Sequence, residues 1–324
     1  MNFERFFDKQ VKPMINLSNI IISWNAKEYL DECLQSIDEN APYFKFETIM
    51  VDNASTDGAP DLVAEKYPQV HLIRNTENLG FAKANNIGIE KSEGKYICLI
   101  NSDAVVLKDC LDLMCNYMDD HPEIGVLGPK VLNRDGSLQP TCREFPTFWK
   151  NLCRATALDK LFPKSRIFGG YFMLNWSHDT VREVDFLSGC FMMVRRSAIE
   201  QVGMLDDNFF FYAEDKDWCK RFWEAGWKVV YFPHAKAIHY LYGSSDKDPV
   251  KLYIQQTKAN LQYYSKHHSR IAKTAFVFTN ILHQTIRILG SSILYILKPS
   301  VKEVSLQKIK RSLACLRWTM NQSD

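Results

Sequence analysis

The sequence has no run of about 18–20 apolar residues without a polar interruption, so no membrane-spanning helix is expected. Glycine and proline are scarce, at 14 and 12 of 324 residues. Together with a hydrophobic content of 46%, this scarcity excludes a collagen-like, low-complexity or wholly disordered chain. The formal net charge is only +2, which argues against a dedicated nucleic-acid binder, so no nucleic-acid partner is expected.

Several short motifs are missing as well. The nine cysteines form no C-x-x-C pair, and several lie inside apolar runs, as Cys98 does, which predicts buried reduced thiols in a cytoplasmic protein. Residues 1–17 contain Glu4 and Asp8 and have no continuous apolar core, so no secretory signal is expected. No G-x-G-x-x-G follows the first predicted strand, which disfavours a dehydrogenase.

The small net charge conceals a division of the chain. Residues 246–324 hold 13 Lys or Arg and 4 Asp or Glu, a net charge of +9, whereas residues 1–245 have 27 basic and 34 acidic groups, a net charge of −7. Polar residues interrupt the apolar stretch 275–297 at helical spacing, which predicts one amphipathic helix, or two joined near Gly290. We expect a basic helical extension that lies on an anionic membrane surface, or else packs on the preceding domain or a second subunit.

Short apolar runs alternate with helical patterns over the first two-thirds of the chain. The predicted strands span residues 19–22, 47–51, 70–73, 96–100, 184–195 and 229–232, and the predicted helices span residues 25–37, 60–66, 80–91, 110–118 and 215–225. This alternation predicts an α/β fold with a parallel sheet, while the prolines between residues 125 and 183 are typical of loops and hairpins. Ligands of such folds bind beyond the carboxyl ends of the strands.

Short segments with characteristic polar residues occur in a fixed order. The first four are residues 21–25 (IISWN), 51–58 (VDNASTDG), 75–88 (NTENLGFAKANNIG) and 99–104 (LINSDA). They are followed by residues 186–189 (FLSG) together with 195–196, then by residues 210–221, and last by residue 239 together with 243–245. As an ordered set they resemble the inverting GT-A fold glycosyltransferases of family 2, in particular the rhamnosyltransferase-like branch of bacterial cell-surface polysaccharide synthesis.

This resemblance implies a Rossmann-like domain over residues 18–245, with a mixed sheet and helices on both faces, between a lead-in (1–17) and a basic amphipathic helical extension (246–324). It also implies transfer of a sugar, best matched by L-rhamnose from dTDP-rhamnose, to a glycan or lipid-linked glycan at the inner face of the cytoplasmic membrane. The alternatives are a hexosyl-, GlcNAc- or galactofuranosyltransferase that uses a UDP-sugar, and a non-catalytic nucleotide-sugar-binding subunit.

The donor side of the implied site involves residues that follow strands or open a helix. Asp52 is placed to read the nucleobase or ribose, or else forms an Asx-turn that caps the next helix. Trp24 stacks on the base or is simply buried, and Asn25 follows it in the same loop. Asn78 and Asn85 lie beside the nucleotide in the family, at a helix start that suits an anion, although Asn78 can equally be a helix cap.

The segment 101–103 occupies the place of the family's Asp-x-Asp metal motif. Asp103 supplies a hard oxygen ligand for Mg²⁺ or Mn²⁺, and also contacts the nucleotide diphosphate, while Asn101 replaces the first acid of the motif. His239 completes the metal site, or else is a structural histidine bonded to backbone. Arg195 and Arg196 hold a phosphate, or else form an exposed basic pair.

Catalysis requires a base for the acceptor hydroxyl and stabilisation of the departing diphosphate. By resemblance Asp215 is the base, and Glu214 orients or contacts the acceptor. The alternative is that both acids only support the first turn of a helix. Ser188 and Gly189 resemble the acceptor-side turn of the family.

Overall fold

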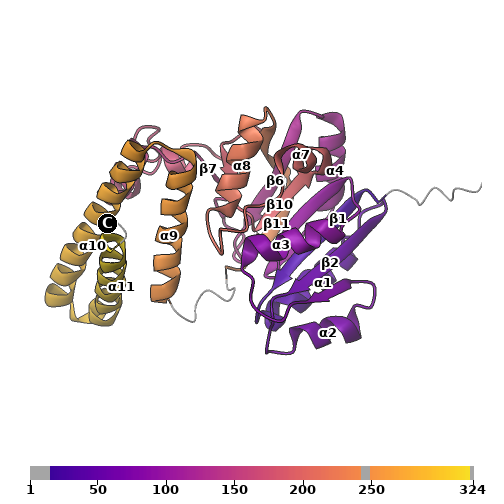
Figure 1. Ribbon diagram of the computed structural model, residues 1–324, viewed down its shortest axis with the longest axis horizontal. Helices are drawn as coiled ribbons and strands as arrows, with labels where there is room; N and C mark the ends of the chain where they lie inside the picture. Colours follow the sequence, from indigo (N-terminus) through magenta and orange to yellow (C-terminus); the bar gives the residue numbers. More distant parts are fainter. Residues whose placement is uncertain (1–14, 242–248, 322–324) are drawn as a thin grey trace, which may run out of the picture.

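In a computed structural model the described residues are 15–241 and 249–321, and they form an α/β domain followed by three long helices (Figure 1). The strands are β1 (Leu17–Ser23), β2 (Phe46–Asp52), β3 (His71–Arg74), β4 (Tyr96–Asn101), β5 (Ala104–Val106), β6 (Ile124–Leu132), β7 (Cys142–Arg143), β8 (Arg182–Glu183), β9 (Phe186–Leu187), β10 (Phe191–Arg195) and β11 (Lys228–His239). The α-helices of the domain are α1 (Lys27–Glu39), α2 (Ala59–Lys66), α3 (Phe81–Lys91), α4 (Cys110–Asp120), α5 (Phe148–Ala155), α6 (Leu158–Leu161), α7 (Arg196–Val202) and α8 (Glu214–Glu224).

The main sheet has the strand order β3-β2-β1-β4-β10-β6-β11-β5, and β8 pairs with β11 at the side of this path. Strands β1 to β4 run parallel to one another, as the strand–helix alternation predicts. Strand β10 is antiparallel to both of its neighbours, which makes the sheet mixed. The predicted mixed-sheet α/β fold with a C-terminal helical region is therefore confirmed.

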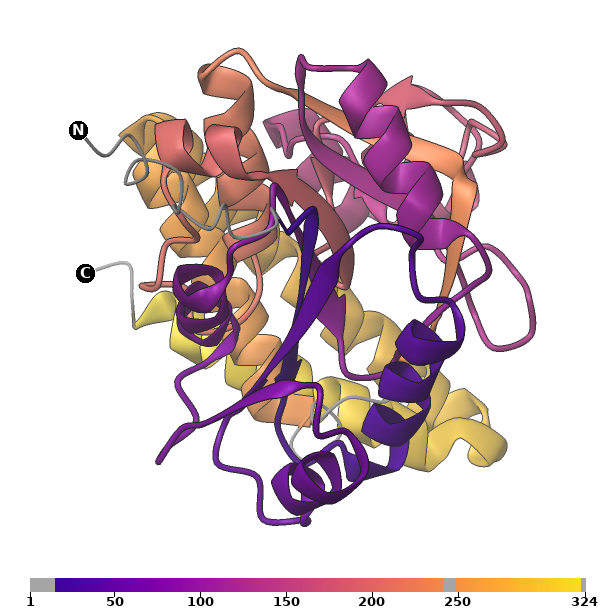
Figure 2. The ribbon, with the colours of Figure 1, turned by 90° about the vertical axis from the view of Figure 1, so that its right-hand side faces the viewer.

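Helices cover both faces of the sheet, because its central strands are apolar on both sides. One core joins the sheet to Leu30 and Leu34 of α1 and Met114 of α4. A second core, on the other face, joins it to Ile89 of α3 and Trp218 of α8. Figure 2 shows α1 and α3 on opposite sides of the first strands. All nine cysteines are buried and reduced.

The C-terminal region consists of α9 (Pro249–His267), α10 (Arg270–Leu297) and α11 (Lys302–Met320), with a short 3₁₀ turn, η3 (Pro299–Val301), before the last helix. Helix α9 lies between the sheet domain and an α10–α11 hairpin (Figure 1). Gly290 does not interrupt α10, which is one continuous helix. None of the described helices combines the length and hydropathy that crossing a bilayer requires.

Two sequence predictions for the middle of the chain are wrong. The glycine- and proline-containing stretch after residue 124 forms β6 in the centre of the sheet, not a loop. The predicted single strand 184–195 is divided, because β9 pairs with β7 in a small separate sheet while β10 joins the main sheet. The turn between these two strands contains Ser188 and Gly189. Residues 1–14 of the predicted lead-in and residues 243–245 of the last motif lie outside the described residues.

Candidate active site

The carboxyl end of β2 carries the predicted nucleotide-binding residue Asp52. This side chain is buried, and its Oδ2 accepts a hydrogen bond from the backbone N–H of Ser55 at 3.1 Å. Its Oδ1 is also buried and has no hydrogen-bond partner among the described residues. A buried carboxylate oxygen without a partner is costly. One oxygen thus forms the turn, and the other remains available to a donor group such as a base N–H or a ribose hydroxyl.

Trp24 and Asn25 occupy the loop after β1, beside the loop that follows Asp52. Asn25 adopts a left-handed backbone conformation (φ 53°), and its Oδ1 accepts from the Thr56 N–H at 2.8 Å. Its own N–H donates to Ser55 Oγ at 2.9 Å. Asn25 therefore links the two loops that border the predicted nucleotide site. Trp24 is half-buried next to it.

The start of α3 packs against the loop that precedes α8. The Gly80 N–H donates to Asn78 Oδ1 at 2.9 Å, and the Phe81 N–H donates to the Phe210 carbonyl at 2.7 Å. Asn78 therefore closes a turn before α3 and does not cap the helix, because the N-cap residue is Gly80 and no side chain caps α3. Asn85 is buried within α3, and its amide nitrogen donates to the Phe81 carbonyl at 2.9 Å.

Gly80 is required by this contact for two reasons. Its φ is +83°, and a Cβ atom there would press into the Phe210 carbonyl oxygen and lie 2.8 Å from a Phe210 ring carbon. We expect Gly80→Ala to lower the free energy of unfolding by about 2–4 kcal/mol, measured by urea denaturation. Gly136→Ala is the matched control, because Gly136 has a φ of +80° but open space around it. Equal losses for both variants would show that the contact with Phe210 adds nothing.

The predicted metal residues lie together where β4 and β11 end. The Nε2 atom of His239 is 3.1 Å from Asp103 Oδ1 and 3.2 Å from the amide nitrogen of Asn101. Both Asp103 and His239 are buried. Within residues 15–241 and 249–321, no cluster of three or more His, Cys, Asp or Glu side chains is arranged to bind a metal ion. A cation at this pair would need further ligands from water or from a diphosphate.

Gln139, which the sequence analysis missed, determines which nitrogen of His239 carries a proton. The Gln139 amide nitrogen donates to Asn133 Oδ1 and to the His239 carbonyl, both at 2.9 Å. Its Oε1 therefore accepts from His239 Nδ1 at 2.7 Å, so the lone pair of neutral His239 is on Nε2. This lone pair faces the Asn101 amide nitrogen at 3.2 Å and Asp103 Oδ1 at 3.1 Å, and the two acceptors Nε2 and Oδ1 repel each other at this distance unless they share a cation or a proton. The arrangement fits a divalent cation, because metal-binding histidines commonly donate their second N–H to such a partner.

Glu214 and Asp215 open α8 after two residues with left-handed backbone, Tyr212 (φ 73°) and Ala213 (φ 66°). Such strain in non-glycine residues persists only where the surroundings enforce it, and it occurs frequently at active sites. The Asp215 carboxylate accepts from the N–H groups of Gly189 (3.2 Å) and Lys216 (2.7 Å).

Burial raises the pKa of Asp215, and these two hydrogen bonds oppose the rise. Burial, together with the Asp215 charge, holds the pKa of Glu214 well above its usual range. The Oε2 atom of Glu214 is buried and has no hydrogen-bond partner among the described residues. A carboxylate at the N-terminus of a helix whose pKa is raised toward neutrality has the properties required of a general base near neutral pH.

The turn that contains Ser188 and Gly189 connects Asp215 to residues 101–103. Gly189 donates to Asp215, and the next residue, Cys190, accepts from the Asn101 N–H at 2.9 Å. A Cβ atom on Gly189 would lie 3.2 Å from the Phe81 ring, so this turn also contacts the start of α3. The turn therefore brings Asp215 and the 101–103 segment to the same edge of the sheet.

Arg195 and Arg196 are neither exposed nor available to a phosphate, so both sequence interpretations are wrong. The Arg195 guanidinium donates to the backbone carbonyls of Ile124, Met118 and His121. Arg196 donates to the Gly94 carbonyl at 2.6 Å. Both arginines satisfy backbone groups at the end of the sheet opposite the site.

Helix α8 is tied to α9 by buried charges that sequence reasoning overlooked. Lys216 is buried, donates to Asn260 Oδ1 at 2.7 Å and lies 4.1 Å from the Tyr263 ring centre. Asp217 is fully buried, and its Oδ1 forms an ion pair with Lys266 Nζ at 2.8 Å. Helix α9 therefore contacts α8 directly behind the two acids of the site.

The pKa values of this buried group are strongly perturbed. Burial lowers the pKa of Lys216 to about 7. Burial alone would raise the pKa of Asp217, but hydrogen bonds from His267 (2.6 Å) and Lys266, with the nearby Arg221 charge, lower it to about 2. Asp217 is thus ionised throughout the physiological range and anchors α9.

Replacing Lys216 tests the electrostatic link to Asp215. The Lys216 charge lowers the pKa of Asp215. Lys216 carries this charge below about pH 7, the range in which a carboxylate base loses activity as it is protonated. We expect Lys216→Met to raise the pKa of Asp215 and therefore to move the acid limb of the kcat–pH profile to higher pH. The control is Lys220→Met on the same helix, which removes a pairing with Glu224. An unchanged acid limb in Lys216→Met would contradict the link.

The mixed sheet with helices on both faces, and with polar residues beyond the carboxyl ends of its strands, has the architecture of the GT-A fold. The family model described as "Glycosyl transferase family 2" matches residues 18–203. The chain therefore belongs to glycosyl transferase family 2, as the sequence resemblance implies.

Two relatives match most of this chain and most of their own length. The N-acetylglucosaminyl-diphospho-decaprenol L-rhamnosyltransferase of Mycobacterium tuberculosis is 28% identical over 261 residues, covering 77% of this chain and 84% of the relative. The dTDP-rhamnosyl transferase RfbF of Shigella flexneri is 25% identical over 285 residues, covering 84% of this chain and 88% of the relative.

Among solved structures, the mannosyltransferase PcManGT from Pyrobaculum calidifontis, in complex with GDP-Man and Mn²⁺, superposes with a TM-score of 0.60 at 15% identity. The similarity covers 97% of this chain and 91% of that protein. At this identity the likeness concerns the fold, and it extends over the C-terminal helices.

Proposed function

We propose that this protein is an inverting, metal-dependent glycosyltransferase that moves L-rhamnose from dTDP-rhamnose to a lipid-linked glycan at the inner face of the cytoplasmic membrane. The observation that carries the choice of sugar is the match to two rhamnosyltransferases over most of both chains. The name of the first relative describes a lipid diphosphate acceptor, which supports the same class of acceptor here.

In the proposed reaction, Asp215 removes the proton from an acceptor hydroxyl as its oxygen attacks the anomeric carbon of the donor. The bond from this carbon to the diphosphate oxygen breaks, and the nucleoside diphosphate departs with the electron pair. Attack from the side opposite the leaving group inverts the configuration. The raised pKa of Asp215 supports its role, because such a base accepts the proton more readily than an ordinary aspartate does.

The other residues bind and orient. Asp103 and His239 would hold a Mg²⁺ or Mn²⁺ ion, which when bound neutralises charge on the diphosphate. The unpartnered Oδ1 of Asp52 supports recognition of the nucleobase or ribose, with Trp24 beside it. Glu214, buried next to Asp215, is assigned to the acceptor side together with Ser188 and Gly189.

A donor panel tests this function. Purified protein with Mn²⁺ is incubated with dTDP-rhamnose, UDP-glucose, UDP-GlcNAc, UDP-galactofuranose and GDP-mannose, and binding and slow hydrolysis of each donor are followed by NMR. We expect dTDP-rhamnose to bind most tightly and to be hydrolysed fastest. Preference for a UDP-sugar would replace the proposed donor, and binding of a donor without any turnover would favour a non-catalytic subunit.

A further inference from the structure

Helix α10 presents a row of apolar side chains to solvent, whereas its fully buried side chains are polar. Its exposed row consists of residues at helical spacing, each 56–82% exposed: Ile271, Phe278, Leu289, Ile293 and Ile296. At 100° per residue, these positions fall within about 60° of one another around the helix and extend over about 38 Å of its length. We call this row the α10 stripe. The buried residues of α10 are Thr279, Gln284 and Ser291.

Helix α11 shows the same reversal. Its buried residues are Ser305, Ser312, Cys315 and Thr319, three of them spaced by seven residues. Thr319 accepts from the Asn280 amide at 3.0 Å, and Gln284 donates to Asn280 Oδ1 at 3.1 Å. Small and polar side chains therefore hold the α10–α11 hairpin together.

An exposed apolar row of this length, with polar side chains between the two helices, is unusual for a protein surface in water. A helix in an aqueous protein buries its apolar stripe and exposes its polar face. In lipid, helices pack through small residues and polar hydrogen bonds, and their apolar side chains face outward. The hairpin therefore has the packing of a lipid-contacting pair, although none of the described helices is long and apolar enough to span the bilayer.

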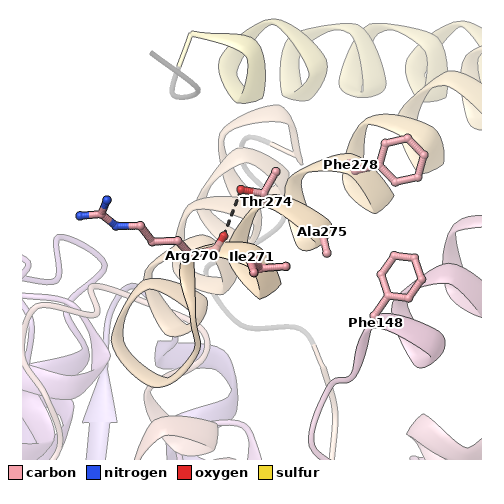
Figure 3. Close-up of a pocket in the computed structure, with 6 residues that line it drawn as sticks. All are labelled: Phe148, Arg270, Ile271, Thr274, Ala275 and Phe278. Atoms are coloured by element: carbon pink, nitrogen blue, oxygen red, sulfur yellow. Dashed lines mark hydrogen bonds between the residues drawn. The ribbon is translucent and has the colours of Figure 1, made fainter.

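The α10 stripe begins at an open groove between α10 and α5. The groove has a volume of about 560 Å³, and it is lined by Phe148, Arg270, Ile271, Thr274, Ala275 and Phe278 (Figure 3). The exposed Phe148 ring extends the apolar surface onto the catalytic domain. The exposed α10 stripe thus borders this groove. Other apolar residues of α10, Ala272 and Phe276, pack against the cluster that includes Phe209 and Ala213 of the catalytic domain, so the packing alternative that the sequence left open holds for that part of the helix.

The positive charges of the hairpin indicate which kind of surface the α10 stripe contacts. Residues 270–320 contain nine Lys or Arg and a single acidic residue, Glu303. At the hairpin turn, the exposed Ile296 and Leu297 are followed directly by Lys298 and then Lys302, both exposed. Apolar side chains bordered by lysines match an anionic phospholipid surface. The apolar side chains insert among the lipids, and the lysines bind the anionic headgroups electrostatically. A second copy of the chain would place these like charges against each other.

We propose that the α10–α11 hairpin is a membrane-docking element, with the α10 stripe inserted among the acyl chains of an anionic bilayer and Lys298 and Lys302 on its headgroups. The inference rests on the burial pattern of the hairpin. It deepens the proposed function by placing the enzyme on the membrane that carries its acceptor, yet it holds for any donor sugar.

Vesicle flotation of the full chain tests the proposal. Wild-type protein should float with vesicles of phosphatidylcholine and phosphatidylglycerol (7:3) and bind pure phosphatidylcholine much more weakly. The triple variant Leu289→Asn, Ile293→Asn, Ile296→Asn should bind at least about tenfold more weakly. Each of Lys298→Gln and Lys302→Gln should weaken binding to the anionic vesicles by about fivefold. The substituted positions are exposed, and circular dichroism checks that the variants remain folded.

The matched control is the pair Tyr43→Asn and Leu113→Asn, exposed apolar positions on the sheet domain, which should float like wild type. The proposal would be overturned if the triple variant bound the vesicles as tightly as the wild type does. It would also be overturned if the wild type did not bind anionic vesicles. A dimeric wild type that the triple variant converts to monomer, with no vesicle binding, would assign the stripe to a second copy instead. Flotation needs neither donor nor acceptor, so its outcome is separate from that of the donor panel.

Discussion

Asp215→Asn is expected to lower kcat by about 10²–10⁴-fold while donor affinity stays near that of the wild type. The amide retains the size of the carboxylate and can accept the Gly189 N–H, but it cannot take a proton from the acceptor hydroxyl. Steady-state transfer assays give kcat, and calorimetric titration with the donor and Mn²⁺ gives affinity. A large loss in kcat with little change in affinity separates a base from a binding residue.

The control for this substitution is Asp207→Asn, which makes the same chemical change at an exposed position shortly before α8. It should transfer at the wild-type rate. If Asp215→Asn also transfers at nearly that rate, Asp215 is not the base. Its buried neighbour Glu214, whose pKa is raised further, then becomes the next residue to test.

Asp103→Asn is expected to lower transfer by about 10²–10³-fold and to abolish stimulation by Mn²⁺. The pair of Asp103 and His239 has one carboxylate and one imidazole, and Asn101 adds no charge. Loss of the single carboxylate removes the only negative protein ligand that the pair supplies. Transfer measured across a Mn²⁺ titration, with donor affinity at each concentration, tests this expectation.

Asp109→Asn serves as the control, because Asp109 is exposed and its left-handed backbone conformation tolerates asparagine. That variant should keep the wild-type response to Mn²⁺. Near-normal turnover of the wild type in excess chelator would contradict a role for the cation. The Asp103–His239 contact would then be a structural one.

The parallel half of the sheet was predictable because each strand is a short apolar run followed by a polar residue and a helix. Strand β6 was not, since its Gly125, Gly128 and Pro129 are typical of loops. In the structure these glycines provide room for neighbours: a Cβ on Gly125 would meet the Trp227 side chain at 2.8 Å, and one on Gly128 would meet Leu187 at 2.9 Å. Tertiary packing thus overrides local propensity there.

Some site residues could be predicted from the local sequence, as the parallel strands could, and others depend on tertiary packing, as strand β6 does. Asp52, Asp103 and Asp215 stand at strand or helix ends, where sequence pattern marks them. Gln139 lies 100 residues from His239, and nothing in its surroundings in the sequence indicates the contact. Lys216 was overlooked, because only the packing of α9 against α8 explains why a lysine side chain is buried there.

The sequence also could not predict which face of each C-terminal helix is buried. The sequence indicated an amphipathic stretch at residues 275–297, but periodicity alone does not say which face is buried. Only the structure reveals that Thr279 and Ser291 face inward while Leu289 and Ile293 face outward.

The proposed rhamnosyl transfer with inversion is tested most directly on the anomeric protons of donor and product. Proton NMR of dTDP-rhamnose with Mn²⁺ and a lipid-linked glycan acceptor follows the anomeric signals of donor and product in a single experiment. We expect loss of the donor signal, release of dTDP and a new rhamnosyl linkage of the opposite anomeric configuration, all slowed by at least about 10²-fold in Asp215→Asn. A product that retains the donor's configuration would contradict the single displacement with Asp215 as base.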